Sequence, residues 1–231
     1  MYTYDFLARK ENFLKRMAFK LFIGEEVVSK SKKVYVYRPD MLRLGTQDME
    51  VIGIRPELDI LGPIIKNIYR HELPMLEEID KTVIMFDQDM QDNIMTSNQC
   101  KMAEFIVSEY GKENFVVKMH PRTVDVPYSE NVPVYKAKCP FEILMSTVDV
   151  EDKILVSILS TASMNPKMIL NVEPIVIFTV KIVGYDKTEA EMEEFLKIVD
   201  RFKALYSDPD RVIVPETMEE FENVIKKLKE K

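Results

Sequence analysis

The sequence predicts an α/β protein in which a parallel sheet is flanked by helices. Short apolar runs alternate with helix signals through the last two-thirds of the chain, and each run is followed by residues typical of a turn or a helix start. Uninterrupted apolar runs are typical of strands that are buried on both faces. The predicted strands cover residues 82–86, 115–118, 154–159, 174–180 and 211–214.

Helix starts are predicted from the spacing of capping boxes, in which a Thr and a Gln or Glu three residues later satisfy each other's amides. The pairs are Thr96 with Gln99, Thr188 with Glu191, and Thr217 with Glu220. Gly111 is placed to end the first of these helices. A further helix is predicted from Asn165 as its cap, with Pro166 in the first helical position.

The first eighty residues have a different pattern. They predict an amphipathic helix near residues 12–22, a strand at 34–37 and a helix that opens at Pro63. This pattern is typical of the end of another domain. The expected organisation is therefore a remnant of an N-terminal domain over residues 1–80 and a second domain over residues 81–231.

Composition predicts a cytoplasmic protein that does not bind nucleic acid. A net charge of -7 opposes the basic face that phosphate backbones require, and the two cysteines have no metal-type spacing. No run approaches the roughly 18 apolar residues that span a bilayer, and the N-terminus lacks a signal-peptide pattern. Basic and apolar residues mix in residues 12–23, which allows peripheral contact with a membrane, although packing within the protein is the preferred interpretation.

Two loops that follow predicted strands carry candidate chemistry, because the carboxyl ends of parallel strands border the crevice where ligands bind. The first is Lys118-Met119-His120-Pro121-Arg122, in which proline stiffens the turn that presents an imidazole and a guanidinium. An imidazole can donate a proton or a hydrogen bond to a departing phosphate. A histidine that only caps a strand is the competing interpretation.

The second loop, Ser160-Thr161-Ala162-Ser163, precedes a predicted helix, so its hydroxyls and amides are available to an anion. A plain capped loop is the alternative. Between the two loops lies Cys139-Pro140-Phe141-Glu142, in which the carboxylate could accept both hydroxyls of a ribose. Taken singly, this Glu is an ordinary choice for a first helical turn.

Together these motifs resemble the C-terminal half of bacterial sialyltransferases, namely the lipooligosaccharide sialyltransferases and the capsule polysialyltransferases. The shared set is Lys118-x-His120-Pro121-Arg122, then Pro140-Phe141-Glu142, then Ser160-Thr161, in this order and at similar spacing. The resemblance covers roughly residues 82–180. It implies a GT-B enzyme whose Rossmann-like C-terminal domain holds the donor CMP-sialic acid.

The resemblance also implies roles for these residues. His120 would be the general acid or the phosphate partner, Ser160 and Thr161 would hold the CMP phosphate, with Ser163 beside them, and Glu142, next to Phe141, would contact the ribose. Lys118 and Arg122 would be supporting cations, with Pro121 shaping their turn. A catalytic base is expected in the loop after residues 82–86, with Asp89 as the candidate and Asp87 as the alternative, unless these are solvated loop residues.

The implied reaction is an inverting, metal-independent transfer of a sialic-acid-like sugar to a surface glycan, with no cofactor. The Asp87-x-Asp89 pair is the one pattern that a divalent cation could use. The chain departs from the family because most of an acceptor domain and its acidic turn are not recognisable, so weak activity or pairing with a second copy stays open. The alternatives are a CDP-alditol phosphotransferase of the teichoic-acid type and a nucleotide-binding domain without turnover.

Overall fold

The computed structural model describes residues 32–39, 50–55, 57–70, 76–88, 92–136, 139–184 and 188–230. The chain divides into two compact units, Met1–Pro56 and Glu57–Lys231. In the first unit, strands β1 (Lys33–Val36) and β2 (Glu50–Gly53) pair in parallel. The strand predicted at 34–37 is thus confirmed to within one residue. The helix predicted near 12–22 lies outside the described residues.

The second unit is built on a six-stranded sheet in which every neighbouring pair is parallel. Its strands are β3 (Val83–Phe86), β4 (Phe115–Lys118), β5 (Val134–Tyr135), β6 (Ile154–Ser157), β7 (Ile175–Phe178) and β8 (Val212–Ile213). The spatial order is β5-β4-β3-β6-β7-β8. This is the order of a doubly wound sheet and is compatible with a Rossmann-like fold. The five strands predicted from the sequence are all present.

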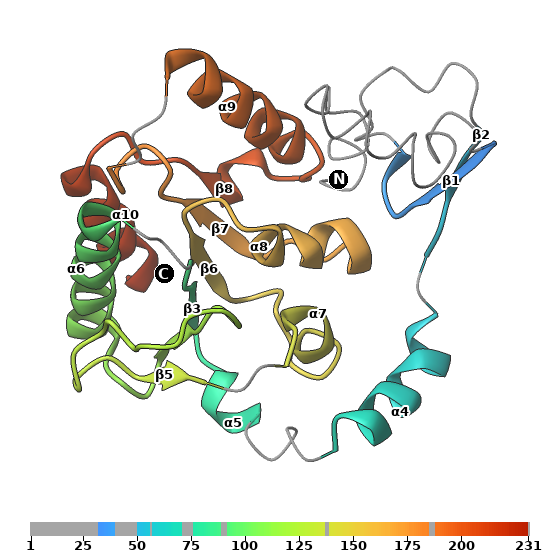
Figure 1. Ribbon diagram of the computed structural model, residues 1–231, viewed down its shortest axis with the longest axis horizontal. Coiled ribbons are helices and arrows are strands. Elements are labelled where there is room, and N and C mark those ends of the chain that lie inside the picture. Colours follow the sequence, from blue (N-terminus) through green and yellow to red (C-terminus); the bar gives the residue numbers. More distant parts are fainter. Residues whose placement is uncertain are drawn as a thin grey trace, which may run out of the picture. The chain divides into compact units, whose positions relative to one another are not determined.

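Helices lie on both faces of the sheet. The second unit contains α4 (Leu58–Ile68) and α5 (Leu76–Ile79) before the first strand of the sheet. After it come α6 (Asn93–Tyr110), α7 (Phe141–Leu144), α8 (Thr161–Asn165), the π-helical turn η3 (Pro166–Leu170), α9 (Glu189–Lys203), the 3-10 turn η4 (Pro209–Arg211) and α10 (Met218–Lys229). Figure 1 shows α6 and α10 on one side of the sheet and α7 and α8 on the other. The predicted α/β architecture is therefore confirmed.

Alternate residues of each strand enter two separate apolar layers. Val83, Met85 and Val117 face the layer that contains the buried residues of α6 and α10. The intervening residues face α7 and α9, where aromatic rings meet edge to face: Phe86 lies 4.7 Å from Phe141, and Phe178 lies 6.0 Å from Phe202, between ring centroids. Because the strands are buried on both faces, their sequences show no polar alternation.

Three helix termini agree with the capping predictions. Thr188 and Glu191 form a reciprocal capping box at the start of α9. Thr217 accepts a hydrogen bond from the amide of Glu220 at the start of α10. Gly111 ends α6 with a φ of 77°, a left-handed conformation that favours glycine.

Three predicted helix starts are wrong. Helix α6 begins three residues before Thr96, because the Asp92 carboxylate caps it by accepting the amides of Ile94 and Met95 at 2.8 and 2.9 Å. Helix α8 begins at Thr161 rather than after Asn165, because Ser160 supplies its cap. Pro166 has no amide to donate, and from this residue the chain continues as a wider π-helical turn. Helix α4 begins at Leu58 and carries Pro63 in its interior.

The connection between β4 and β5 contains no helix, although crossovers between parallel strands usually contain one. Residues 119–133 cross instead as a loop, which we name the crossover loop. Met119, Tyr128 and Val132 of this loop are buried in the same apolar layer as α6. Residues 119–133 therefore occupy the side of the sheet that a crossover helix would cover.

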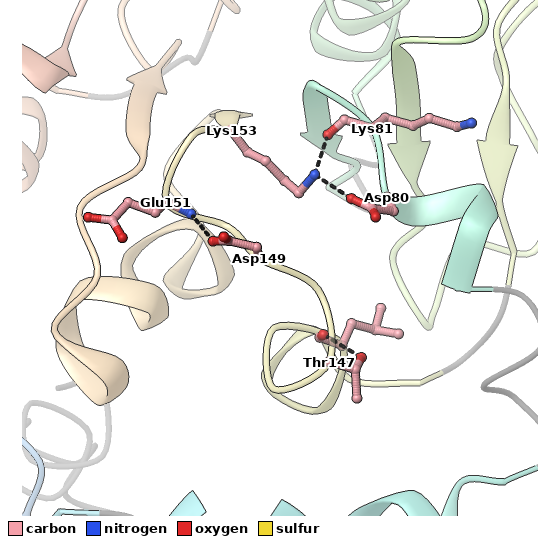
Figure 2. Close-up of polar contacts among 7 residues, drawn as sticks. Asp80, Lys81, Thr147, Asp149, Glu151 and Lys153 are labelled. Atoms are coloured by element: carbon pink, nitrogen blue, oxygen red, sulfur yellow. Dashed lines mark hydrogen bonds and ion pairs between the residues drawn. The ribbon is translucent and has the colours of Figure 1, made fainter.

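The amino edge of the sheet is joined by polar contacts (Figure 2). The Lys153 ammonium lies 2.5 Å from the Asp80 carboxylate and donates to the carbonyl of Lys81 at 3.1 Å, which links the start of β6 to the start of β3. The Asp149 carboxylate accepts the Glu151 amide at 3.1 Å and shapes the turn before β6. In the part of the chain that the structure describes, no helix is long and apolar enough to cross a membrane.

Candidate functional site

The candidate site lies at the carboxyl edge of the sheet, around the end of β3. Strands β4 and β6 flank β3, and the strand order reverses between β3 and β6, which is where doubly wound sheets bind their ligands. His120 follows β4 and Ser160 follows β6. Two strand spacings, about 10 Å, therefore separate the ends of the two strands that carry the predicted loops.

Asp87, the first residue after β3, is buried and forms the centre of a hydrogen-bonded cluster. Its Oδ2 accepts the His120 amide at 3.1 Å and the Thr123 hydroxyl at 2.6 Å, and its Oδ1 accepts the Tyr128 hydroxyl at 2.8 Å. Burial, followed by the Asp87 charge, raises the pKa of Tyr128, so this hydroxyl stays protonated and donates. The carboxylate of Asp87 thus fastens the crossover loop to β3.

His120 is half-buried and its ring has a defined tautomer. The amide of Arg122 donates to Nδ1 of His120 at 3.2 Å. A backbone amide can only donate, so Nδ1 carries no proton and the proton of the neutral ring lies on Nε2. The amide of Thr123 donates to the carbonyl of His120 at 3.0 Å and closes a tight turn. Pro121 and Arg122 are exposed at this turn.

The turn after β6 places its three predicted residues in different environments. Ser160 caps α8, because its hydroxyl accepts the Ala162 amide at 3.2 Å. Ser163 is fully buried, and its hydroxyl is 2.8 Å from the Ser157 hydroxyl and 2.8 Å from the Ser160 carbonyl. Thr161 is half-buried, and no hydrogen bond is recorded for its hydroxyl within the described residues. The Thr161 hydroxyl has no recorded partner, and the Ser160 hydroxyl only accepts a hydrogen bond, so among the described residues of this turn both still have a proton to donate to a ligand.

Lys118 ends β4 with a buried side chain that is 5% exposed. Its ammonium lies 5.9 Å from the centroid of the Tyr135 ring, and no ion pair with it is recorded among the described residues. Burial lowers the pKa of Lys118, opposed by the nearby Cys139 and Glu142. A buried ammonium without a hydrogen-bonded counter-charge favours the approach of an anion.

Glu142 lies in the first turn of α7, close enough to Lys118 to act on its charge. Its carboxylate accepts a hydrogen bond from the Asn165 side chain at the end of α8, so α7 and α8 are joined at this point. Phe141, predicted beside the nucleotide, is buried against Phe86. Its ring packs in the core and holds α7 against the end of β3.

A pair of glutamines joins the loops across the reversal of the sheet. Gln99 of α6 is buried and exchanges two hydrogen bonds with the backbone of Gln88, each 3.2 Å long. The Gln88 side chain accepts the Leu159 amide at 3.3 Å. The end of β3 is therefore connected to the turn after β6 as well as to the crossover loop.

Asp89, the predicted base, lies outside the described residues, so its distance from His120 is not part of the structure. Among the residues that the structure does describe, no group of three or more His, Cys, Asp or Glu side chains is placed to hold a metal ion. The site at this edge is thus built from one imidazole, hydroxyls, a buried ammonium and two carboxylates that already have partners.

Several residues of the site were not identified from the sequence. Thr123 and Tyr128 gave no local signal, because their role depends on how the crossover loop folds back onto Asp87. Gln99 was recognised only as a capping partner, although a glutamine on the apolar side of a helix is itself a signal of a buried polar contact. No model of a known protein family matches the chain, and no curated protein is detectably similar to it.

Proposed function

We propose that the chain is a glycosyltransferase that transfers a sialic-acid-like sugar from a CMP donor to a glycan hydroxyl. The observation that carries this proposal is the position of the His120 turn and the Thr161 hydroxyl on opposite sides of β3, at the point where the strand order reverses. An anion placed there meets donors from both loops. The resemblance to bacterial sialyltransferases supplies the identity of the donor and stays a prediction.

The donor phosphate is proposed to lie between these two loops. His120 would donate its Nε2 proton to a phosphate oxygen, because Nδ1 is already engaged by the Arg122 amide. Thr161 would donate its hydroxyl from the start of α8. Donors that are fixed before the reaction stabilise the charge that develops on a leaving group without reorganisation.

The buried Lys118 is proposed to supply a fixed positive charge behind the phosphate. Lys118 as a whole is 5% exposed, and an interaction between charges is stronger at a buried position than in water. Glu142 is proposed to accept the ribose hydroxyls, with its carboxylate held in place by Asn165. Arg122, exposed at the His120 turn, would add a second cation at the mouth of the site.

The general base is proposed to come from outside the Asp87 cluster. Both oxygens of Asp87 accept hydrogen bonds from the crossover loop, and the side chain is 5% exposed. Asp89 remains the candidate from the sequence. The arrangement of two GT-B domains, the lipooligosaccharide or capsule acceptor and the absence of a metal requirement are all parts of this proposal.

A nucleotide-binding domain without turnover is the second candidate, and the state of Asp87 favours it. A carboxylate that is buried and hydrogen-bonded to three donors is poorly placed to take a proton from an acceptor. In this case CMP would bind but no sugar would be transferred. The two candidates share one nucleotide site and differ only in turnover.

Calorimetric titration and thermal unfolding with CMP, UMP, AMP, CMP-sialic acid and CDP-glycerol test the nucleotide site. Among the three monophosphates we expect CMP to bind most tightly and to raise the melting temperature most, because a ligand that binds only the native state stabilises it by mass action. Equal responses to all nucleotides, or none, would sink the proposal. Preference for CDP-glycerol over CMP-sialic acid would favour the alditol phosphotransferase.

Thr161→Val is the sharpest variant for this test, because it removes a hydroxyl without breaking a recorded hydrogen bond and keeps the shape of the side chain. We expect CMP affinity to fall about tenfold to a hundredfold, the range of one hydrogen bond to a charged group. Thr82→Val is the matched control, since Thr82 is exposed at the opposite edge of the sheet. Equal affinities of the two variants would contradict the placement of the phosphate.

A further inference from the structure

The conformation of the crossover loop depends on one buried carboxylate. Asp87 accepts hydrogen bonds from the backbone of His120 and from the hydroxyls of Thr123 and Tyr128, at 3.1, 2.6 and 2.8 Å. Its own amide donates to the Lys118 carbonyl at 3.0 Å, which continues the pairing of β3 with β4. The acceptor is therefore held by the sheet, and the three donors belong to the loop.

The same loop contains the hydrogen bond that fixes the tautomer of the His120 ring. Asp87 holds the amide of His120 and the side chain of Thr123, which are the two ends of the turn that contains Arg122. The Arg122 amide donates to Nδ1 inside this turn, and we expect this hydrogen bond to be lost if the turn opens. An open turn would release Nδ1, and the neutral ring would then be free to carry its proton on either nitrogen.

We infer that Asp87 is a positioning residue that holds His120 as a neutral hydrogen-bond donor with its proton on Nε2. This inference deepens the proposed function and rests on it for the identity of the anion. Asp87 does not touch the substrate in this arrangement. Its contribution is to keep a donor in place and in one tautomer, so that binding of the anion requires no rearrangement of the ring.

The carboxylate suits this role because of its surroundings. A buried charge is stable only when its oxygens accept enough hydrogen bonds, and Asp87 has three from the loop. If the loop opened, Asp87 would lose these three hydrogen bonds, and this loss opposes opening. We call Asp87 and its three donors, the His120 amide and the Thr123 and Tyr128 hydroxyls, the clamp.

Nitrogen NMR of the imidazole tests the inference directly, because the chain contains only two histidines, His71 and His120. A His71→Gln background leaves His120 as the single imidazole signal. At a pH where the ring is neutral, we expect the chemical shifts of a proton on Nε2 and a bare Nδ1. In Asp87→Asn we expect the two nitrogen shifts to move toward each other as both tautomers become populated.

The matched control is Asp125→Asn, which makes the same change in the same loop at an exposed residue with no recorded hydrogen bond. Thr123→Val and Tyr128→Phe each remove one donor and should move the shifts by part of the Asp87→Asn effect, which keeps the test valid if Asp87→Asn fails to fold. CMP affinity should fall about tenfold in Asp87→Asn and stay unchanged in Asp125→Asn.

The outcomes separate this inference from the proposed function. The three clamp variants are Asp87→Asn, Thr123→Val and Tyr128→Phe. The inference is overturned, even if CMP binds, by a proton on Nδ1 in the wild-type chain. It is also overturned if all three variants stay folded and keep the wild-type tautomer. An Nε2 tautomer that is lost in the clamp variants, combined with no CMP binding by the wild-type chain, supports the clamp and overturns the proposed function.

Discussion

His120 is the residue whose chemistry can be tested most finely, because its two nitrogens have different neighbours. Glutamine can place an amide donor near the position of Nε2, whereas asparagine places its amide near Nδ1. If His120 acts as a neutral donor, His120→Gln should keep most of the CMP affinity, and His120→Asn and His120→Ala should each lose about tenfold. Calorimetric titration measures these affinities.

The three His120 variants should have nearly the same free energy of unfolding as the wild-type chain, since the side chain is half-buried and makes one recorded hydrogen bond. An unfolded His120→Ala with the other two variants folded would identify the histidine as structural. If turnover is found, and His120→Gln loses it as completely as His120→Ala does, the ring acts as a general acid instead.

Glu173 is the residue that should link stability to pH. Burial alone would raise the pKa of its carboxyl, but hydrogen bonds from Lys167 and Ser207 outweigh burial and lower the pKa to about 2, from an ordinary value of 4.5. A carboxyl with a lowered pKa stabilises the native state above its unfolded pKa. Its contribution should therefore be complete above pH 5 and disappear as the pH falls from about 4.5 toward 2.

Urea unfolding of Glu173→Gln checks this expectation. The variant should be less stable than the wild-type chain at pH 7, and the difference should shrink toward pH 3 because glutamine resembles the protonated acid. Glu130→Gln, at an exposed residue with no recorded partner, is the control and should show no such trend. A difference that is constant with pH would mean that Glu173 stabilises the protein through packing rather than through its charge.

At the scale of elements, the end of α6 depends on the backbone of Gly111. This residue has φ 77° and ψ 161°, a combination of backbone angles that residues other than glycine rarely adopt. Gly111→Ala should cost about 1–3 kcal/mol of the free energy of unfolding. Circular dichroism during thermal unfolding measures the loss.

A double variant separates the two reasons for this cost. A Cβ at Gly111 would also approach the Glu113 carboxylate to 2.3 Å, but that side chain is free to move. Adding Glu113→Ala should therefore not restore stability if backbone strain dominates. Full restoration would show that the clash, and not the dihedral angle, is the cause.

Helices and strands were predictable from the sequence where a single local signal, such as an apolar run or one capping residue, determines where they lie. Buried parallel strands are continuous apolar runs, so β3, β4, β6 and β7 were predicted to within a few residues. Strand β5 was missed because its two residues, Val134 and Tyr135, have no periodicity of their own. The start of α6 was misplaced because Asp92 competes with Thr96 for the role of cap, and both are good caps by composition.

The site was predictable only to the level of loops. Residues that directly follow parallel strands converge on one edge by topology, so His120 and Ser160 could be placed there in advance. Which hydroxyls stay free could not be read from the sequence. Ser163 and Thr161 are two residues apart, yet one is fully buried against Ser157 and the other is half-exposed at the helix start.

At the scale of the whole molecule, the sheet predicts how local stability is distributed. The central strands β3, β4, β6 and β7 are paired on both sides, whereas β5 and β8 are two-residue edge strands. Hydrogen exchange should therefore be slowest in the central strands and fast at both edges. Mass spectrometry of exchanged peptides measures this order.

Addition of CMP should slow exchange in residues 118–123 and 158–163 and leave the amino edge around Lys153 unchanged, because the proposed site lies at the carboxyl edge. Slowing confined to the amino edge would move the binding site to the other end of the sheet. Uniform slowing would indicate general stabilisation without a localised site.

The hydrogen bond from Tyr128 to Asp87 also gives the protein an optical reporter. The chain has ten tyrosines and no tryptophan, so tyrosine emission is not lost by transfer to an indole. A phenol that donates to a carboxylate emits weakly, because the excited ring passes its proton to the acceptor. Tyr128 should therefore be dark while the crossover loop is closed onto Asp87 and bright when it opens, and stopped-flow fluorescence would follow that motion without any added label.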